Sequence, residues 1–508
     1  MFSKIFSFGL VGIDGLKIDV EVDISKGMPH YEIVGLPDVA VKESRERVRS
    51  AIKNSGYRFP TNRIIINLAP ASIKKVGPNF DLPIAISILR SSEQIKSDKV
   101  SNFVIIGELG LDGAVKPVAG ILPALISAKQ QGFKNFIIPK QNEKEASFID
   151  GISVYALSTL NEVVCFLDGV MEFEPIPKTI WKNDEMTNIS EDFSRVKGQK
   201  IAKRAIEIAV AGGHNILMVG PPGAGKTMIA KCIPSIMPDL TFDEALEITK
   251  IHSIAGELDL SKGVISSRPF RSPHHTASTV SLIGGGKDAK PGEVSLASNG
   301  VLFLDELPEY ARGTLETLRQ PLEDGVVTIS RASGTYEYPA SFMLVASMNP
   351  CPCGNYGSTS AVCTCSPNQI QNYLKRLSGP LLDRIDLKID VERVTFLDIT
   401  SKTGEEPSAK IKERIDKARA IQTERYKGTI VHTNAKMTTK MLNEYCKLDA
   451  ESESLMKMAF DKYHISARGY SRILKVARTI ADLEASENIN FNHIAEAIAY
   501  RNIDKFQL

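Results

Sequence analysis

The chain has 508 residues, of which 43% are hydrophobic and 24% charged, and its formal net charge is only +2 at pH 7. This composition is typical of a folded globular protein of roughly three domains, and it excludes both a disordered chain and a uniformly basic nucleic-acid-binding chain. No apolar run reaches the roughly 18–20 residues of a membrane span, and the apolar start contains Asp14 and alternates like a strand. We therefore predict a cytoplasmic protein without a signal peptide.

Residues 1–168 mix short strands, such as residues 16–24 and 63–70, with helical stretches such as residues 124–132. We expect them to form an α+β domain. Residues 39–76 carry nine Lys or Arg against two acids. Apolar residues recur there at helical spacing, which favours a solvated helix face over a nucleic-acid surface. Polar, proline-containing residues 169–195 are predicted to be a linker.

Residues 196–394 alternate between helices and short, continuously apolar strands at 215–220, 301–304 and 342–348. Such strands predict a parallel sheet that is covered by helices on both faces. Strand signals fade after this region. Residues 395–508 contain several helical segments, so we expect a small all-helical domain at the C-terminus.

A glycine-rich loop with the pattern G-x-x-x-x-G-K-[ST] lies between an apolar strand and a helical segment. Glycines allow the loop to turn tightly so that successive N–H groups face phosphate oxygens, and the following helix start adds a positive end. The lysine would contact the β- and γ-phosphates, and the threonine hydroxyl would bind Mg²⁺. The loop consists of Gly220, Pro221, Pro222, Gly223, Ala224, Gly225, Lys226 and Thr227.

Three polar residues at strand ends complete the predicted site. Asp305 and Glu306 follow one apolar strand, where carboxylates would stand at the C-terminal edge of a parallel sheet. We predict Asp305 as a Mg²⁺ ligand and Glu306 as the general base for the attacking water. Asn349 ends a third strand and is predicted to orient that water.

Arg384 follows a tight turn and has two interpretations of equal weight. It could reach the γ-phosphate of a neighbouring subunit, a role worth roughly 10³–10⁵ in rate. It could instead form an ordinary salt bridge with Asp383 or Asp386.

Together these motifs resemble the AAA+ ATPases, with residues 220–227 similar to Walker A and residues 301–306 similar to Walker B. The strings RPFRSPHHTAS, PGEVSLASNGVLFLDELPE and NPCPCGNYG resemble the ComM/YifB magnesium chelatase-like family over essentially the whole chain. The resemblance implies an AAA+ core and a helical lid. It identifies Arg384 with the arginine finger and places a second sensor at Arg468, with Arg472 as the second choice.

The resemblance also implies a ring, usually a hexamer, that acts as a DNA helicase in branch migration during homologous recombination and DNA uptake. Residues 256–300 and 326–340 would line a central channel. They would contact phosphates through Arg268, Arg271, Lys287 and Arg331, although ordinary surface hairpins are an equal alternative. The alternative function is remodelling of a protein or a metal-insertion partner, as in magnesium chelatases.

Residues 106–145 separately resemble the proteolytic domain of Lon. Lon uses a serine nucleophile activated by a lysine. In this chain Asn79 stands at the serine position and Leu122 at the lysine position. We therefore expect a binding or ring-forming domain rather than a protease.

The remaining candidates are metal ligands. Four cysteines form the pattern C-x-C-x₉-C-x-C, which favours a structural Zn²⁺ site over free thiols in a reducing compartment. His274 and His275 are adjacent, so in a strand they would point to opposite faces and would not share one ion. The four cysteines are Cys351, Cys353, Cys363 and Cys365.

Overall fold

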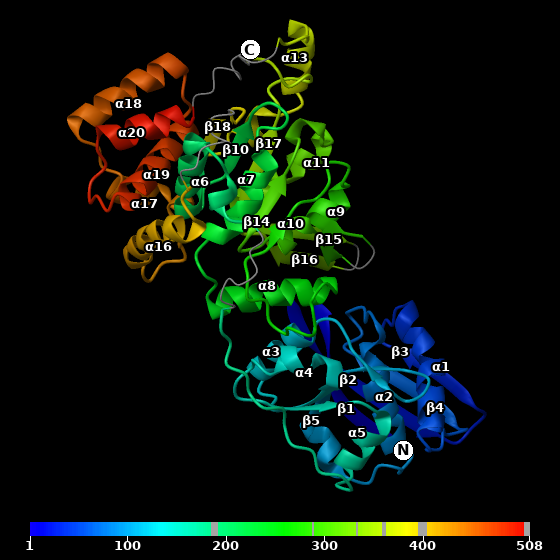
Figure 1. Ribbon diagram of the computed structural model, residues 1–508. Coiled ribbons are helices and arrows are strands. Elements are labelled where there is room, and N and C mark those ends of the chain that lie inside the picture. Colours follow the sequence, from blue (N-terminus) through cyan, green and yellow to red (C-terminus); the bar gives the residue numbers. More distant parts are fainter. Residues whose placement is uncertain (184–190, 287–288, 332–333, 358–361, 395–403, 502–508) are drawn as a thin grey trace.

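The computed structural model describes residues 1–183, 191–286, 289–331, 334–357, 362–394 and 404–501. An N-terminal sheet with its own core, a second sheet and a bundle of helices follow one another along the chain (Figure 1). This agrees with the predicted mixture of an α+β region, a parallel sheet and a helical C-terminal region. The exact domain boundaries remain predictions.

The N-terminal region is built on a seven-stranded mixed sheet. Strand β1 pairs antiparallel with β2 and parallel with β5, so the pairing changes from antiparallel to parallel at the centre of the sheet. In spatial order the strands are β3 (His30–Val34), β4 (Arg63–Ala69), β2 (Asp14–Ser25), β1 (Phe2–Val11), β5 (Phe103–Ile105), β8 (Asn135–Pro139) and β9 (Ser153–Leu157).

Helices cover both faces of this sheet. One apolar cluster joins α1, α2 and α5 to the strands, and a second joins α3 and α4 to the opposite face. Helix α1 buries Val41, Val48 and Ile52, which leaves its basic residues mostly on the outer side. The helices are α1 (Val39–Asn54), α2 (Asp81–Ser91), α3 (Ile121–Gln130), α4 (Glu143–Ala146) and α5 (Leu160–Leu167); a short ribbon joins β6 (Glu108–Leu109) to β7 (Val115–Lys116).

The second sheet has five strands, and all neighbouring strands within it are parallel. The strand that leads to the glycine-rich loop, β10, lies between β17 and β18. The order is β11 (Phe270–Arg271), β14 (Val301–Leu304), β17 (Met343–Met348), β10 (Ile216–Val219) and β18 (Leu387–Asp390).

Alternate residues of these strands enter two different cores. Ile216 and Met218 pack on one face, whereas Leu217 and Val219 pack on the other. Because both faces are buried, the strands must be apolar at every position, as the sequence predicted. The first face shares its core with the C-terminal helices, which attaches those helices firmly to the sheet.

Shorter elements connect the strands of this sheet. Helix α8 stands between the two sheet regions (Figure 1). The elements are α6 (Lys200–Gly212), α7 (Lys226–Cys232), α8 (Phe242–Ala255), α9 (Thr279–Ile283), β12 (Gly284–Gly285), β13 (Lys290–Pro291), α10 (Glu293–Leu296), α11 (Arg312–Thr317), α12 (Arg319–Asp324), β15 (Val326–Arg331), β16 (Gly334–Pro339), α13 (Pro367–Leu374) and α14 (Gly379–Leu382).

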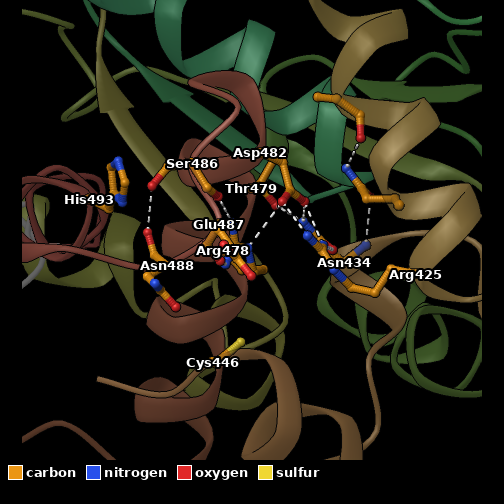
Figure 2. A network of polar contacts seen from close by, with 12 residues as sticks. Arg425, Asn434, Cys446, Arg478, Thr479, Asp482, Ser486, Glu487, Asn488 and His493 are labelled. Atoms are coloured by element: carbon orange, nitrogen blue, oxygen red, sulfur yellow. Dashed lines mark hydrogen bonds and ion pairs between the residues drawn. The ribbon is translucent and has the colours of Figure 1, made fainter. Parts of the chain in front are cut away.

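The C-terminal helices are held by a buried polar network (Figure 2). Asp482 accepts hydrogen bonds from Arg425, Arg478 and Asn434, so its buried charge is fully paired. The hydroxyl of Thr479 lies 2.8 Å from Nε2 of His214, which connects the network to the end of α6. The helices are α16 (Ser408–Arg425), α17 (Thr439–Tyr445), α18 (Ala450–Tyr463), α19 (Ala467–Leu483) and α20 (Phe491–Ala499).

Across the part of the chain that the structure describes, no helix is both long and apolar enough to cross a membrane.

Candidate nucleotide-binding site

The glycine-rich loop leaves the C-terminal end of β10 and enters α7, as predicted. A Cβ on Gly220 would lie 2.2 Å from the carbonyl oxygen of Val391, so a larger residue cannot fit there. Gly223 and Gly225 adopt φ angles of +75° and +86°, a conformation that favours glycine. These positions explain why the loop requires glycines at this spacing.

Lys226 is buried at the base of the loop and points back along it. Its Nζ donates hydrogen bonds to the carbonyl oxygens of Gly220 at 2.6 Å and Pro221 at 3.0 Å. It also donates to Oδ1 of Asn349 at 3.1 Å. Burial lowers the pKa of Lys226, whereas the charges of Asp305 and Glu306 act to raise it.

Asp305 stands beside Thr227, with the two residues brought together from neighbouring elements. The Thr227 hydroxyl donates to Oδ2 of Asp305 at 2.9 Å. The hydroxyl of Ser347 binds the other carboxylate oxygen, and the backbone N–H of Glu306 donates to the same oxygen at 3.0 Å. A hydroxyl and a carboxylate in contact are hard oxygen donors that fit Mg²⁺.

Glu306 follows directly and has a backbone φ of +52°, which is unusual for a residue with a side chain. Its side chain is about half exposed, and Oε2 lies 3.5 Å from Nδ1 of His275. A partly exposed carboxylate next to the phosphate loop can accept a proton from water.

Asn349 completes the group from the third strand. Because β17 lies between β14 and β10, its C-terminal end falls between the acids and the glycine-rich loop. The structure therefore brings Lys226, Thr227, Asp305, Glu306 and Asn349 to one edge of one sheet. Their catalytic roles remain predictions.

Arg384 lies at the opposite edge of the same sheet. It precedes β18, whose residue Leu387 pairs with Ile216 at the start of β10, whereas the glycine-rich loop follows the end of β10. The guanidinium forms an ion pair with Glu323 and donates to the carbonyl oxygens of Pro380 at 2.8 Å and Arg319 at 3.2 Å. It lines a pocket of about 620 Å³.

The predicted salt-bridge partners of Arg384 are wrong. Among the described residues, Asp386 pairs with Arg472 at 2.5 Å and Asp383 pairs with Arg501 at 3.6 Å. Burial alone would raise the pKa of Asp386, but the nearby His214 ring, whose Nδ1 lies 3.6 Å from Oδ2 of Asp386, and the charge of Arg472 hold this pKa below its ordinary value. Sequence spacing could not identify Glu323, which is 61 residues away.

The candidate lid sensors lie on the first turns of α19. Arg472 forms an ion pair with Asp386. This pair lies at the edge of the sheet opposite the glycine-rich loop of the same chain. Arg468 is exposed and lies one helical turn earlier, on the same side of the helix. Both arginines therefore lie near the edge that carries Arg384, and a sensor role stays a prediction.

Two of the four candidate phosphate contacts form ion pairs within the chain, and a role in DNA contact stays a prediction. Arg268 binds Glu244 at 3.1 Å and the carbonyl oxygen of Asn299 at 2.7 Å. Arg271 binds Glu293 through two nitrogens. Arg331 is exposed at the end of β15, and Lys287 lies outside the described residues.

The histidine pair also differs from the expected geometry. His274 and His275 lie in a turn rather than a strand, and their ring centroids are 4.1 Å apart. The reasoning that they point to opposite faces was therefore wrong. His274 instead contacts Thr276 at 2.9 Å, and His275 faces Glu306.

The four cysteines converge on one point. Their sulfur atoms all lie within 4.8 Å of one another, and within the described ranges they are the one group of three or more His, Cys, Asp or Glu residues with metal-binding geometry. Sγ of Cys351 lies 3.4 Å from that of Cys353 and 3.7 Å from that of Cys363. The metal itself remains a prediction.

In the N-terminal region the side chains at the two protease positions are inert. The Asn79 amide donates to the carbonyl oxygen of Phe8 at 3.3 Å, and Leu122 is fully buried in α3. An amide and an aliphatic side chain supply neither a nucleophile nor a base.

Two residues near the nucleotide site were not predicted. Ser347 binds Asp305, and its position two residues before Asn349 on a central strand was a usable signal. His275 faces Glu306 across 3.5 Å, but only the folded chain shows this contact.

Family models match nearly the whole chain. Residues 192–399 match the model described as magnesium chelatase, subunit ChlI, residues 20–142 match subunit ChlI of Mg-chelatase, and residues 405–501 match the ChlI C-terminal model.

Individual relatives extend over the same length. The chain is 44% identical to competence protein ComM of Haemophilus influenzae, covering 98% of this chain and 97% of the relative. It is also 44% identical to the uncharacterized protein YifB of Escherichia coli, covering 97% of this chain and 96% of the relative. A segment of 124 residues is 34% identical to Lon protease 2 of Bacillus subtilis, covering 24% of this chain and 22% of that protein.

Proposed function

Because the chain belongs to the ComM/YifB family of magnesium chelatase-like AAA+ ATPases, we propose that it is a ring-forming DNA motor driven by Mg-ATP. It would act as a helicase that promotes branch migration in homologous recombination and DNA uptake. The observation that carries the proposal is the convergence of Lys226, Thr227, Asp305 and Asn349 at one edge of a parallel sheet.

These residues suggest how hydrolysis proceeds. Lys226 binds the β- and γ-phosphates, and Thr227 and Asp305 hold the metal. Mg²⁺ neutralises phosphate charge when it is bound. Glu306 accepts the proton of the attacking water, and Asn349 positions that water from the adjacent strand. Ser347 fixes the carboxylate of Asp305, so the metal ligand is oriented in advance.

The position of Arg384 supports the proposal of a ring. This guanidinium lies at the edge of the sheet opposite its own phosphate loop, so within one subunit it has no role at the γ-phosphate. It lines an open pocket with Arg319 and Glu323. We propose that a neighbouring subunit docks its nucleotide site here, with Arg384 exchanging Glu323 for the γ-phosphate and Arg468 acting from the same edge.

DNA is the proposed partner because a relative that matches over nearly the full chain is a competence protein. The hairpin of β15 and β16, with exposed Arg331, is the proposed channel contact. Zn²⁺ at the four cysteines is proposed as a structural cofactor.

The proposal is tested with ATPase and branch-migration assays on a four-way DNA junction. We expect junction DNA to stimulate hydrolysis and ATP to drive strand exchange, and both effects to disappear in Lys226→Ala. Normal ATP hydrolysis that DNA does not stimulate, without strand exchange, would instead indicate a remodeller of a protein or metal-insertion partner.

A further inference from the structure

The cysteine cluster packs directly against the phosphate loop. Gly354, in the turn that follows Cys353, has a φ of +79°. A Cβ built on Gly354 would lie 2.4 Å from Cδ and 3.0 Å from Cγ of Pro222. Since Pro222 is part of the phosphate loop, the turn that carries two of the cysteines supports one side of this loop.

The same cluster is joined to the nucleotide site through a strand end. Cys351 lies two residues after Asn349, the residue that accepts a hydrogen bond from Lys226 at 3.1 Å. Tyr373 of α13 is buried beside this segment, with its side chain close to Cys351 and to the backbone of Asn349. The cysteine turn is therefore linked to the site in two ways, by its packing on Pro222 and by the short chain connection from Cys351 to Asn349.

The sulfur geometry fits one tetrahedral ion. Zn–S bonds of about 2.3 Å in a tetrahedron place sulfur atoms about 3.8 Å apart. The observed separations are 3.4 Å for Cys351 and Cys353, 3.5 Å for Cys353 and Cys363, and 3.7 Å for Cys351 and Cys363. The backbone N–H of Tyr356 donates to Sγ of Cys351 at 3.3 Å, as expected for a ligand whose remaining lone pair is oriented by the chain.

A bound ion would add to the contacts that hold this turn. Cys353 and Cys365 line an open pocket, and the cysteines are free thiols rather than disulfides. A short loop with one buried cysteine cannot fix its own conformation by apolar burial alone. Four metal–sulfur bonds can fix this conformation, because metal binding supplies folding free energy directly.

We propose that Zn²⁺ bound by Cys351, Cys353, Cys363 and Cys365 positions the phosphate loop and the Asn349 amide, so that nucleotide binding depends on this ion. The inference deepens the proposed ATPase function and rests on it only for the identity of the nucleotide. Gly354 and the cysteines are positioning residues, because they act through Pro222 and Asn349 and do not touch the phosphates themselves.

The first experiment measures the zinc content of the full-length protein by mass spectrometry and its affinity for a fluorescent ATP analogue. We expect about one Zn²⁺ per chain. Removing the ion with a chelator should weaken nucleotide binding, and adding Zn²⁺ back should restore it. Absence of bound zinc, or unchanged nucleotide affinity after its complete removal, would overturn the proposal.

The second experiment separates metal binding from its effect on the loop. Gly354→Val should retain zinc but displace Pro222, lowering nucleotide affinity by about tenfold or more. Cys363→Ser should lose both zinc and affinity, whereas Cys165→Ser, in the N-terminal region, should lose neither. Full nucleotide affinity in zinc-loaded Gly354→Val would contradict the positioning role. No DNA is used, so a failure here is distinguishable from a failure of the motor proposal.

Discussion

Ser253 of α8 donates a hydrogen bond of 3.2 Å to Glu145 of the N-terminal region, and its oxygen accepts the N–H of Gly120 at 3.0 Å. A single hydroxyl thus connects α8, the second α-helix after the phosphate loop, with a buried carboxyl group in the Lon-like region. Glu145 also accepts hydrogen bonds from the Asn142 side chain at 2.5 Å and the Leu122 N–H at 3.4 Å. Through this contact the N-terminal region and α8 can influence each other.

The stability contributed by the Glu145 contact should depend on pH. Burial raises the pKa of Glu145 to about 7, although hydrogen bonds from Asn142, Ser253 and Leu122 act to lower it. The folded protein therefore favours the protonated carboxyl, and this stabilisation is present below about pH 4.5 and lost as pH rises through 7. Wild type should lose about 1–3 kcal/mol relative to Glu145→Gln between pH 5 and pH 8.

Thermal unfolding of both proteins at pH 5 and pH 8 measures this difference. Glu145→Gln removes the titration, and any hydrogen bond lost with it costs the same at both pH values. Glu143→Gln, in the same short helix, is the control and should change nothing with pH. Equal pH dependence in wild type and Glu145→Gln would show that Glu145 does not titrate in this range.

Lys226→Ala should abolish ATP binding or turnover, because it removes the ammonium group that lies at the base of the phosphate loop. Lys231→Ala is a matched control in the same helix. Lys231 is half exposed, and its ion pair with Glu191 is long, at 3.9 Å, so its loss should have little effect. Binding of a fluorescent nucleotide and phosphate release are the measurements. Normal turnover in Lys226→Ala would place the phosphates elsewhere.

Glu306→Gln should bind ATP normally but hydrolyse it at least about a hundredfold more slowly, because an amide cannot accept the proton of water. Single-turnover kinetics with labelled ATP measure binding and cleavage separately. Glu309→Gln, three residues later and paired with Arg376 at 2.9 Å, serves as the comparison. If Glu306→Gln cleaved ATP at the wild-type rate, another base would have to be found.

Ser347→Ala should raise the Mg²⁺ concentration needed for half-maximal hydrolysis, because Asp305 loses the hydroxyl that orients it. We expect a shift of about tenfold. Ser341→Ala, at an exposed position just before the same strand, should leave the titration unchanged. An unshifted Mg²⁺ titration in Ser347→Ala would mean that Asp305 is held in place without it.

The sequence predicted the parts of the site that depend on local pattern. A glycine-rich loop and strand-terminal acids are set by neighbouring residues, and they appear where expected. The intrachain partners of Arg268 and Arg271 could not be predicted, because Glu244 and Glu293 lie 24 and 22 residues away. The packing of Gly354 on Pro222 depends on how two loops meet, which spacing along the chain does not encode.

The central claim is that neighbouring subunits share one nucleotide site, and mixing two inactive variants tests it most directly. Lys226→Ala retains Arg384, and Arg384→Ala retains an intact phosphate loop. Mixed at equal amounts with junction DNA, they should form rings in which about a quarter of the sites are complete, because each site needs one intact half from each variant. ATP hydrolysis should return to about a quarter of the wild-type rate. A mixture as inactive as its two components would contradict the account.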